Sequence, residues 1–156
     1  MTTATLTAVP TIREATEADV ARIVEMGRRF RRETVYQRVP ENVAQMTWLA
    51  HGLIAAEAGT ILVAERDGAL IGMLGLLVYS NPISGEWTAG ELFFWVEPEH
   101  RGYGVRLLRR AEAWAVGHGA SRIQMIAPTP EVETFYARLG YAAVEVAYDK
   151  ALDVTT

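Results

Sequence analysis

Apolar side chains recur along this chain at helical spacing in four places. Ile23, Met26 and Phe30 lie three and four residues apart, so a helix here would present one apolar face. Thr16 or Asp19 is the candidate cap of its first turn, because short polar and acidic side chains are favoured where a helix begins. The pattern predicts helices over residues 16–30, 41–59, 103–116 and 130–140.

Between these helices the pattern changes to the short apolar runs typical of strands. Asp67 and Gly68 separate two such runs, and this dipeptide is a strong hairpin signal. Pro98 ends another run, because proline cannot donate to a strand ladder. Strands are predicted over residues 11–16, 60–66, 69–80, 88–98 and 121–128, with one or two closing strands in 141–152. This order of elements predicts a mixed sheet with helices on both faces.

The length and composition are those of a globular protein. A chain of 156 residues can bury one core, and we expect a loose tail over residues 1–10 and a single domain over 11–156. Half of the residues are hydrophobic and 22% are charged, which excludes a disordered chain. The N-terminus lacks signal-peptide features, and no apolar run reaches the roughly 18 residues of a membrane helix. We expect a cytoplasmic protein that binds no membrane.

Several kinds of chemistry are missing from the sequence. The chain has no cysteine, which excludes disulfides, thiolate nucleophiles and cysteine-based zinc sites. His51, His100 and His118 are scattered, without metal-ligand spacing, so we expect no metal. None of the three serines lies in a Gly-x-Ser-x-Gly motif. Metal-dependent and serine-hydrolase mechanisms are therefore disfavoured.

A glycine turn stands between the strand ending at Pro98 and the helix that follows. Arg101, Gly102, Tyr103 and Gly104 form it, and four basic residues fall within residues 101–110 although the whole chain has a formal charge of −4. Glycine allows close approach of a ligand and positive φ, and a helix start favours anions. A phosphate cradle and a tight turn followed by a solvated basic helix face both fit this pattern.

Two segments resemble motifs of the GCN5-related N-acetyltransferases. The stretch RGYGVR is similar to the family's acetyl-coenzyme A loop, Arg/Gln-x-x-Gly-x-Gly/Ala, with Arg101 and Gly104 at matching positions. Arg106 departs from it, because the family has a small residue there. The stretch TPEVETFYARLGY resembles a later helix of the family. The residues that fit are Phe135, Tyr136, Gly140 and Tyr141, while Thr129 and Val132 replace the usual Asn and Ala.

The resemblance covers roughly residues 11–150 and implies a fold, an activity and a cosubstrate. The implied fold is an α+β domain with a mixed, mostly antiparallel sheet of six to seven strands and about four helices. The implied donor is acetyl-coenzyme A, with the pyrophosphate and 3′-phosphate at the cationic turn and a backbone N–H near Val96 polarising the acetyl carbonyl. The implied cofactor-binding residues are Val96, Arg101, Gly102, Tyr103, Gly104, Val105, Arg106 and Thr129.

Acetyl transfer to an amine needs a base for the amine and an acid for the departing thiolate. An amine of the lysine type is mostly protonated near neutral pH, so a carboxylate, directly or through water, must help to remove a proton. The resemblance assigns this role to Glu91 and the acid role to Tyr136. Glu86, Glu97 and Glu99 are alternative bases, with Glu97 the weakest. A solvated strand carboxylate and a core tyrosine are the structural alternatives.

The resemblance places the acceptor between the first two helices and their connection. That segment carries five arginines, Arg28, Arg29, Arg31, Arg32 and Arg38, which form either a solvated face or a site for an anionic part of the acceptor. An amino acid, a polyamine, an aminoglycoside-like drug and a protein amino group all remain candidates. The acidic chain disfavours nucleic acid as a partner, and a homodimer is the family expectation. The rival function is a non-catalytic acyl-coenzyme A-binding module, which stays open because Arg106 and Thr129 depart from the family pattern.

Overall fold

The computed structural model describes residues 8–154. Its contacts divide the chain after Ile126 into two units, each of which is described by itself. The expected tail falls mostly on residues 1–7, which lie outside the described residues.

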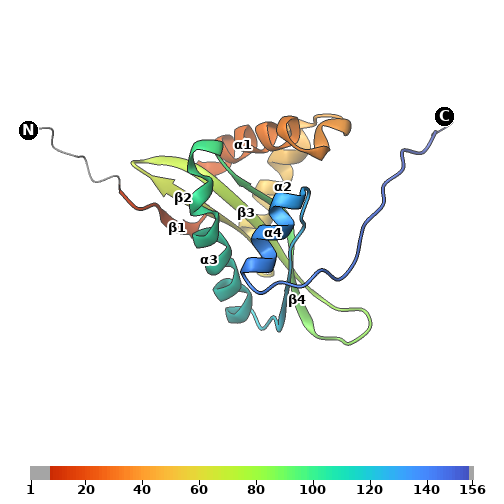
Figure 1. The fold of residues 1–156 in the computed structure, drawn as a ribbon. Coiled ribbons are helices and arrows are strands. Elements are labelled where there is room, and N and C mark those ends of the chain that lie inside the picture. Colours follow the sequence, from red (N-terminus) through yellow and green to blue (C-terminus); the bar gives the residue numbers. More distant parts are fainter. Residues whose placement is uncertain (1–7, 155–156) are drawn as a thin grey trace, which may run out of the picture. The chain divides into compact units, whose positions relative to one another are not determined.

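The first unit is built on one mixed sheet (Figure 1). Its strands are β1 Thr11–Glu14, β2 Gly59–Arg66, β3 Ala69–Ser80, β4 Trp87–Val96 and β5 Arg122–Gln124. They follow one another in the order β1-β2-β3-β4-β5, with β1 to β4 antiparallel and β5 parallel to β4. The predicted hairpin is confirmed, since Asp67 and Gly68 join β2 to β3 with φ of 51° and 77°. Both values lie in the left-handed region that the favoured two-residue hairpin turns require.

Helices cover both faces of this sheet (Figure 1). One face packs against α3, Gly104–Gly117, through Leu107, Ala111 and Trp114. The other face packs against α1, Val20–Glu33, and α2, Val43–Ala55. Three 3-10 helices complete the connections: η1 Glu17–Asp19, η2 Val35–Arg38 and η3 Pro98–Tyr103. The first three predicted helices are thus confirmed, with their ends shifted by a few residues.

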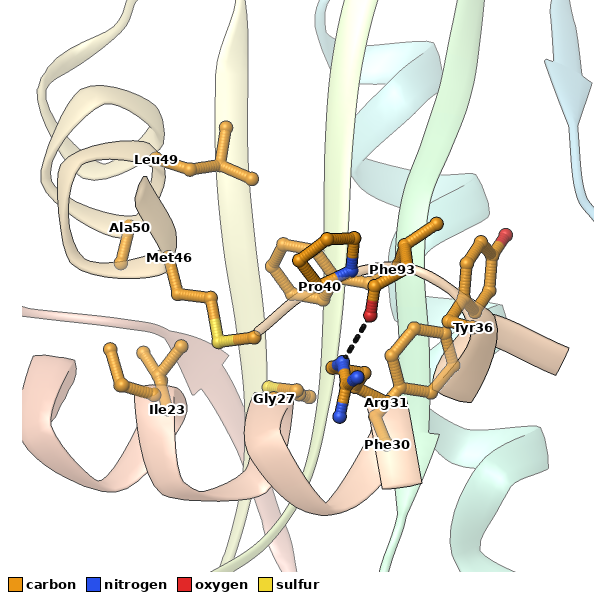
Figure 2. Close-up of a pocket in the computed structure, with 13 residues that line it drawn as sticks. Ile23, Gly27, Phe30, Arg31, Tyr36, Pro40, Met46, Leu49, Ala50 and Phe93 are labelled. Carbon is orange, nitrogen blue, oxygen red and sulfur yellow. Dashed lines mark hydrogen bonds between the residues drawn. The ribbon is translucent and has the colours of Figure 1, made fainter. Parts of the chain in front are cut away.

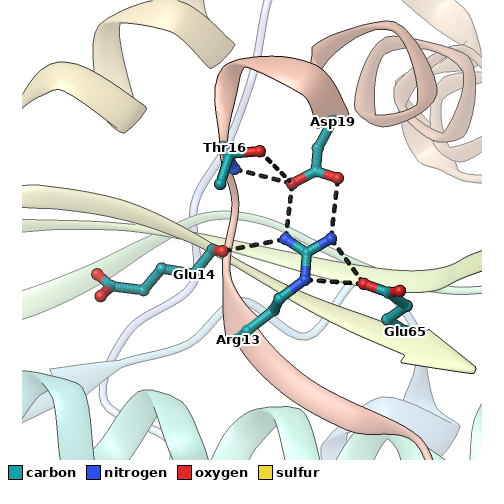
Figure 3. Close-up of polar contacts among 5 residues, drawn as sticks. All are labelled: Arg13, Glu14, Thr16, Asp19 and Glu65. Atoms are coloured by element: carbon teal, nitrogen blue, oxygen red, sulfur yellow. Dashed lines mark hydrogen bonds and ion pairs between the residues drawn. The ribbon is translucent and has the colours of Figure 1, made fainter. Parts of the chain in front are cut away.

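Both residues predicted to cap the first helix lie at its start (Figure 3). Thr16 precedes η1, and the backbone N–H of Thr16 donates a hydrogen bond of 2.8 Å to the Asp19 carboxylate. The guanidinium of Arg13 in β1 holds the Asp19 carboxylate from the other side, at 2.7 and 3.0 Å, and its Nε donates to Glu65 of β2 at 2.8 Å. This cluster fixes the start of α1 to the sheet.

The second unit contains α4, Pro130–Arg138. Thr129 caps this helix by accepting from Val132 N, and Gly140, with φ of 89°, ends it in the left-handed conformation common after a helix. The closing strands expected in 141–152 are absent among the described residues. The sheet therefore has five strands, and the expectation of six to seven was wrong. Alternating apolar residues give a segment the capacity to pair, but only a neighbouring strand's backbone makes it a strand.

Candidate active site

β4 changes its pairing halfway along its length. Gly75 of β3 lies opposite Phe93 and Leu76 lies opposite Glu91, so Leu92 is an extra residue and β4 bulges there. On the other side, β4 pairs with β5 only over Thr88–Gly90. From Glu91 onward β4 has no paired strand on that side among the described residues.

The unpaired edge of β4 presents backbone groups. Glu97 N donates to Ile71 O of β3 at 2.8 Å, and backbone groups in an antiparallel ladder point alternately to either side. The N–H and C=O groups of Trp95 therefore point toward β3, whereas those of Phe94 and Val96 point away from it. Val96 N–H, the donor that the sequence singled out, lies on this unpaired edge.

The glycine turn continues directly from this strand as η3 and α3. Gly104 N donates to Arg101 O, so a 3-10 turn runs into the helix without a break. Neither Gly102 nor Gly104 has positive φ, so the conformation of this turn does not require glycine at either position. A Cβ at Gly102 would meet no atom of the described chain within 4 Å. Close approach from outside is thus the remaining physical reason for a glycine at Gly102.

The basic residues of the turn differ in what they contact. The Arg101 guanidinium lies 5.2 Å from the ring centroid of Trp95, in cation–π contact. Arg109 pairs with Glu112 at 2.9 Å. Arg106 is exposed, and within residues 8–154 it forms no hydrogen bond or ion pair. Arg106 is therefore an expected phosphate-binding side chain that is exposed and has no ion-pair partner within residues 8–154.

The four candidate carboxylates have separate environments. Glu97 is buried and receives hydrogen bonds from Arg22 at 2.9 Å and Arg29 at 2.6 Å, which makes it an anchor for α1. Glu86 is exposed, and its hydrogen-bonded neighbour Arg122 lowers its pKa, which makes it a weaker base. Glu99 is exposed in η3.

Glu91 occupies a different position, at the bulge of β4. One of its carboxylate oxygens accepts from Ile126 N at 2.8 Å. Its charge also reaches the phenol of Tyr36: burial raises the pKa of Tyr36, and the negative charge of Glu91 raises it further. The negative charge of Glu91 therefore acts on a residue of η2, in the connection between α1 and α2.

An apolar pocket of about 200 Å³ opens between α1, η2, α2 and the strands β3 and β4 (Figure 2). Phe30 of α1, Met46 of α2 and Phe93 of β4 line it, together with Tyr36. Sequence reasoning placed the acceptor in this region but did not identify these residues. Gly27, an isolated glycine inside a helical pattern, was the available signal.

The arginine-rich segment, residues 28–38, forms hydrogen bonds and ion pairs within the chain. Arg28 pairs with Glu41 at 3.2 Å, and Arg29 pairs with Glu33 as well as Glu97. Arg31 donates to the carbonyls of Val39 and Gln37. These contacts favour a structural role for these three arginines.

The second unit holds the candidate acid. Tyr136 is a buried residue of α4, and its ring lies 5.4 Å from the rings of both Phe135 and Tyr141. Tyr136 O also accepts hydrogen bonds from the backbone N–H groups of Leu139 and Tyr141 at the helix end. The ring is thus held within its own unit by aromatic neighbours that the motif supplies.

The described part of the chain has neither a metal-binding cluster nor a membrane-spanning helix. Residues 8–154 contain no group of three His, Cys, Asp or Glu side chains placed to hold a metal ion. None of the helices in the same range has the length and apolar character needed to cross a bilayer.

A family model matches the chain, and several solved structures share its fold. The model of the family described as "Acetyltransferase (GNAT) family" matches residues 23–141. A transcriptional regulator from Bacillus halodurans C-125 is 23% identical, with 92% of this chain and 99% of that chain covered and a TM-score of 0.77. An aminoglycoside 6′-N-acetyltransferase from Acinetobacter haemolyticus is also 23% identical, with coverage of 92% and 99% and a TM-score of 0.71.

A third solved structure has a similar fold at lower identity. It is described as a predicted acetyltransferase with acetyl-CoA from Clostridium acetobutylicum, and it is 16% identical over 91% of this chain and 96% of that chain, with a TM-score of 0.78. No curated protein matches the chain significantly.

Proposed function

This chain belongs to the GNAT family of N-acetyltransferases, and we propose that it transfers acetyl from acetyl-coenzyme A to a primary amine by direct attack in a ternary complex. The observation that carries this proposal is the second half of β4. There the bulge at Leu92 separates the carboxylate of Glu91 from an unpaired backbone edge at Phe94 and Val96, and the same strand leads into the glycine turn.

The glycine turn and the edge of β4 are the proposed binding site of the donor. Acetyl-coenzyme A supplies an activated thioester when it is bound. Open space at Gly102 would let a phosphate approach the backbone, and the uncommitted charge of Arg106 would add attraction. Val96 N–H would donate to the acetyl carbonyl oxygen. We assign donor binding to Val96, Arg101, Gly102, Tyr103, Gly104, Val105, Arg106 and Thr129.

The reaction transfers two protons in addition to the acetyl group. The amine nitrogen bonds to the carbonyl carbon, the carbon–sulfur bond breaks, the amine gives up a proton, and the thiolate gains one. Glu91 is the proposed base, directly or through water, because its carboxylate lies at the bulge beside the acceptor side. Tyr136 is the proposed acid, because a phenol is a plausible donor to a thiolate.

The pocket between α1 and α2 is the proposed acceptor site. Tyr36, whose pKa is raised by burial and further by the charge of Glu91, is one of its lining residues. The guanidinium of Arg31 is hydrogen-bonded to the backbone, so the walls of the pocket are largely apolar.

Coenzyme-thiol release tests the proposal. Glu91→Gln keeps an oxygen that can accept from Ile126 N but removes the base, so turnover should fall by about 10²–10⁴-fold with acetyl-coenzyme A affinity unchanged. Glu86→Gln is the matched control and should behave as the parent. Acetyl-coenzyme A binding without thiol release from any amine would instead support the acyl-coenzyme A-binding module.

A further inference from the structure

The lining of the acceptor pocket is almost entirely hydrocarbon. Twelve of the thirteen lining residues are apolar, aromatic or glycine, and the polar groups of the lining side chains are the Arg31 guanidinium and the Tyr36 hydroxyl. Arg31 Nε donates to Val39 O at 2.6 Å (Figure 2). Arg31 Nη2 donates to Gln37 O at 3.1 Å, so these donors are held by the chain itself. A polar group entering this pocket would find few partners and would lose its hydrogen bonds to water.

The volume of about 200 Å³ suits a single apolar group. Roughly 150 Å³ lined by aliphatic and aromatic side chains is enough to hold benzene. The pocket can therefore take a phenyl ring or a branched alkyl chain with a few further methylenes. An aminoglycoside, with several sugar rings, exceeds it.

Gly27 has no role in the fold that explains it. It lies inside α1, where glycine is unfavourable by about 1 kcal/mol relative to alanine. Its φ is not positive, and a Cβ there would meet only Met46 Sδ, at an ordinary 3.5 Å. Because Gly27 lines the pocket, its missing side chain is what keeps that part of the pocket open.

Phe93 is positioned across the pocket by a second glycine. A Cβ at Gly75 of β3 would approach the Phe93 ring to within 2.5–2.9 Å, so the ring lies directly over that strand. Phe93, Phe30 and Met46 are only partly buried, which leaves apolar surface available to a ligand. The two glycines thus shape one apolar cavity from different elements.

The charges around the pocket favour one amine over several. Glu41, which follows the lining residue Pro40, is paired with Arg28 at 3.2 Å. Arg32 in the last turn of α1 and Arg38 of η2 are exposed. A polycation would bring several like charges to these guanidinium groups, whereas a monoamine brings one.

We propose that the acceptor is a primary amine with one aromatic or branched aliphatic group, which fills the pocket. This rests on the proposed acetyl transfer and names its substrate class. A simple amine and an amino acid with the same side chain share this chemistry.

A panel of amines at fixed acetyl-coenzyme A tests the class by thiol release. The apolar acceptors are phenethylamine and isopentylamine, phenylalanine is the amino-acid arm, and putrescine and kanamycin are the polycations. We expect kcat/KM for the apolar acceptors to exceed that for the polycations at least tenfold. Comparing kcat/KM for phenylalanine and phenethylamine shows whether the acceptor is an amino acid or a simple amine.

Pocket-filling variants locate the selectivity. Gly27→Leu should raise KM for phenethylamine at least tenfold, because the added side chain would occupy the space that the aromatic ring needs. Gly52→Leu is the matched control, because Gly52 lies inside α2 with no atom near its missing Cβ. If Gly27→Leu does not fold, Gly27→Ala replaces it, with a smaller shift in the same direction and Gly52→Ala as its control.

The outcomes separate the two proposals. Turnover confined to polycations, or a Gly27 variant that handles phenethylamine as the parent does, overturns the substrate class and leaves acetyl transfer standing. If no amine is turned over, calorimetric titration of phenethylamine decides: binding that the Gly27 substitution weakens supports the apolar ligand class, and absence of binding overturns it.

Discussion

Arg29 Nη1 lies 2.6 Å from Oε2 of the buried Glu97 carboxylate and joins the middle of α1 to the end of β4. Arg22 holds the other oxygen at 2.9 Å and also donates to Leu70 O. Through this pair of arginines, the helix that walls the proposed acceptor pocket is fixed to the strand that leads into the glycine turn.

Replacing Glu97 should therefore destabilise the protein. Glu97→Gln removes the charge from a buried site and leaves two guanidinium groups without their partner, so the free energy of unfolding should fall by about 1–3 kcal/mol. Urea denaturation of the purified variant measures this. Glu99→Gln, two residues away and exposed, should remain within about 0.5 kcal/mol of the parent. If Glu97→Gln and Glu99→Gln were equally stable, the ion pairs of Glu97 with its two arginines would contribute nothing to the free energy of unfolding.

The Asp19 cluster predicts a dependence of stability on pH. The hydrogen-bonded guanidinium of Arg13 lowers the pKa of Asp19, the backbone N–H of Thr16 adds to this effect, and burial opposes it (Figure 3). The unfolded chain binds a proton at higher pH than the folded one, near the ordinary aspartate pKa of about 3.9. The stabilisation is therefore complete above that pH and is lost as the pH falls through the lowered folded pKa.

Asp19→Asn should lower the free energy of unfolding by about 1.5–3 kcal/mol at pH 7, the range for hydrogen bonds to charged groups. The difference from the parent should shrink at pH 4 and further at pH 3, as measured by urea denaturation. Asp67→Asn, at the exposed hairpin turn, serves as the control. A difference that stays constant with pH would show that the Asp19 charge is not the cause.

Two buried strand threonines should respond in opposite directions to the same substitution. Thr88 Oγ1 has no hydrogen-bond partner among residues 8–154, whereas Thr60 Oγ1 donates to Glu14 at 3.0 Å. Thr88→Val removes an unsatisfied hydroxyl and should stabilise the protein by about 1 kcal/mol, while Thr60→Val should destabilise it by a similar amount. Thermal unfolding of both variants gives the signs, and destabilisation by Thr88→Val would imply a partner for that hydroxyl.

The open space at Gly102 predicts a change in donor binding without a change in folding. Gly102→Val should weaken acetyl-coenzyme A binding by about 1–3 kcal/mol, the range for crowding a close contact. Titration calorimetry measures the affinity, and thermal unfolding checks the fold. Gly117→Val, at the far end of α3 and equally open, should bind as the parent does. The same loss in both variants would remove the turn from the donor site.

Tyr136 should matter to turnover and not to binding. Tyr136→Phe keeps the ring contacts with Phe135 and Tyr141 and deletes the proposed proton donor. We expect parental affinity for acetyl-coenzyme A and a fall in turnover of roughly 10²-fold, at the low end of general-acid contributions. Thiol release and binding are measured on the same preparation. Full turnover would assign the proton to water or to another residue.

Local signals in the sequence were sufficient for most of the elements. The Asp67-Gly68 turn, the caps at Thr16 and Asp19 and the strand end before Pro98 depend on backbone preferences of neighbouring residues. The two motifs around Gly104 and Tyr136 carried the family, and the family model confirms it.

Residues distant in the chain decided the rest. Glu97 was a weak candidate base by sequence, and only folding brings it to Arg22 and Arg29, which are 75 and 68 residues away. The alternation in 141–152 favours a strand, but the described structure has no strand in that segment. The pocket combines α1, η2, α2, β3 and β4, so no local pattern contains it.

By itself, the sequence determined the elements, the family and the residues that carry candidate chemistry, because turns, caps and amphipathic periods act over a few residues. Only the tertiary structure decided which carboxylate is buried as an anchor, which strand edge stays unpaired and how large a group fits between α1 and α2. Each of these depends on packing and hydrogen bonds between segments that meet only when the chain is folded.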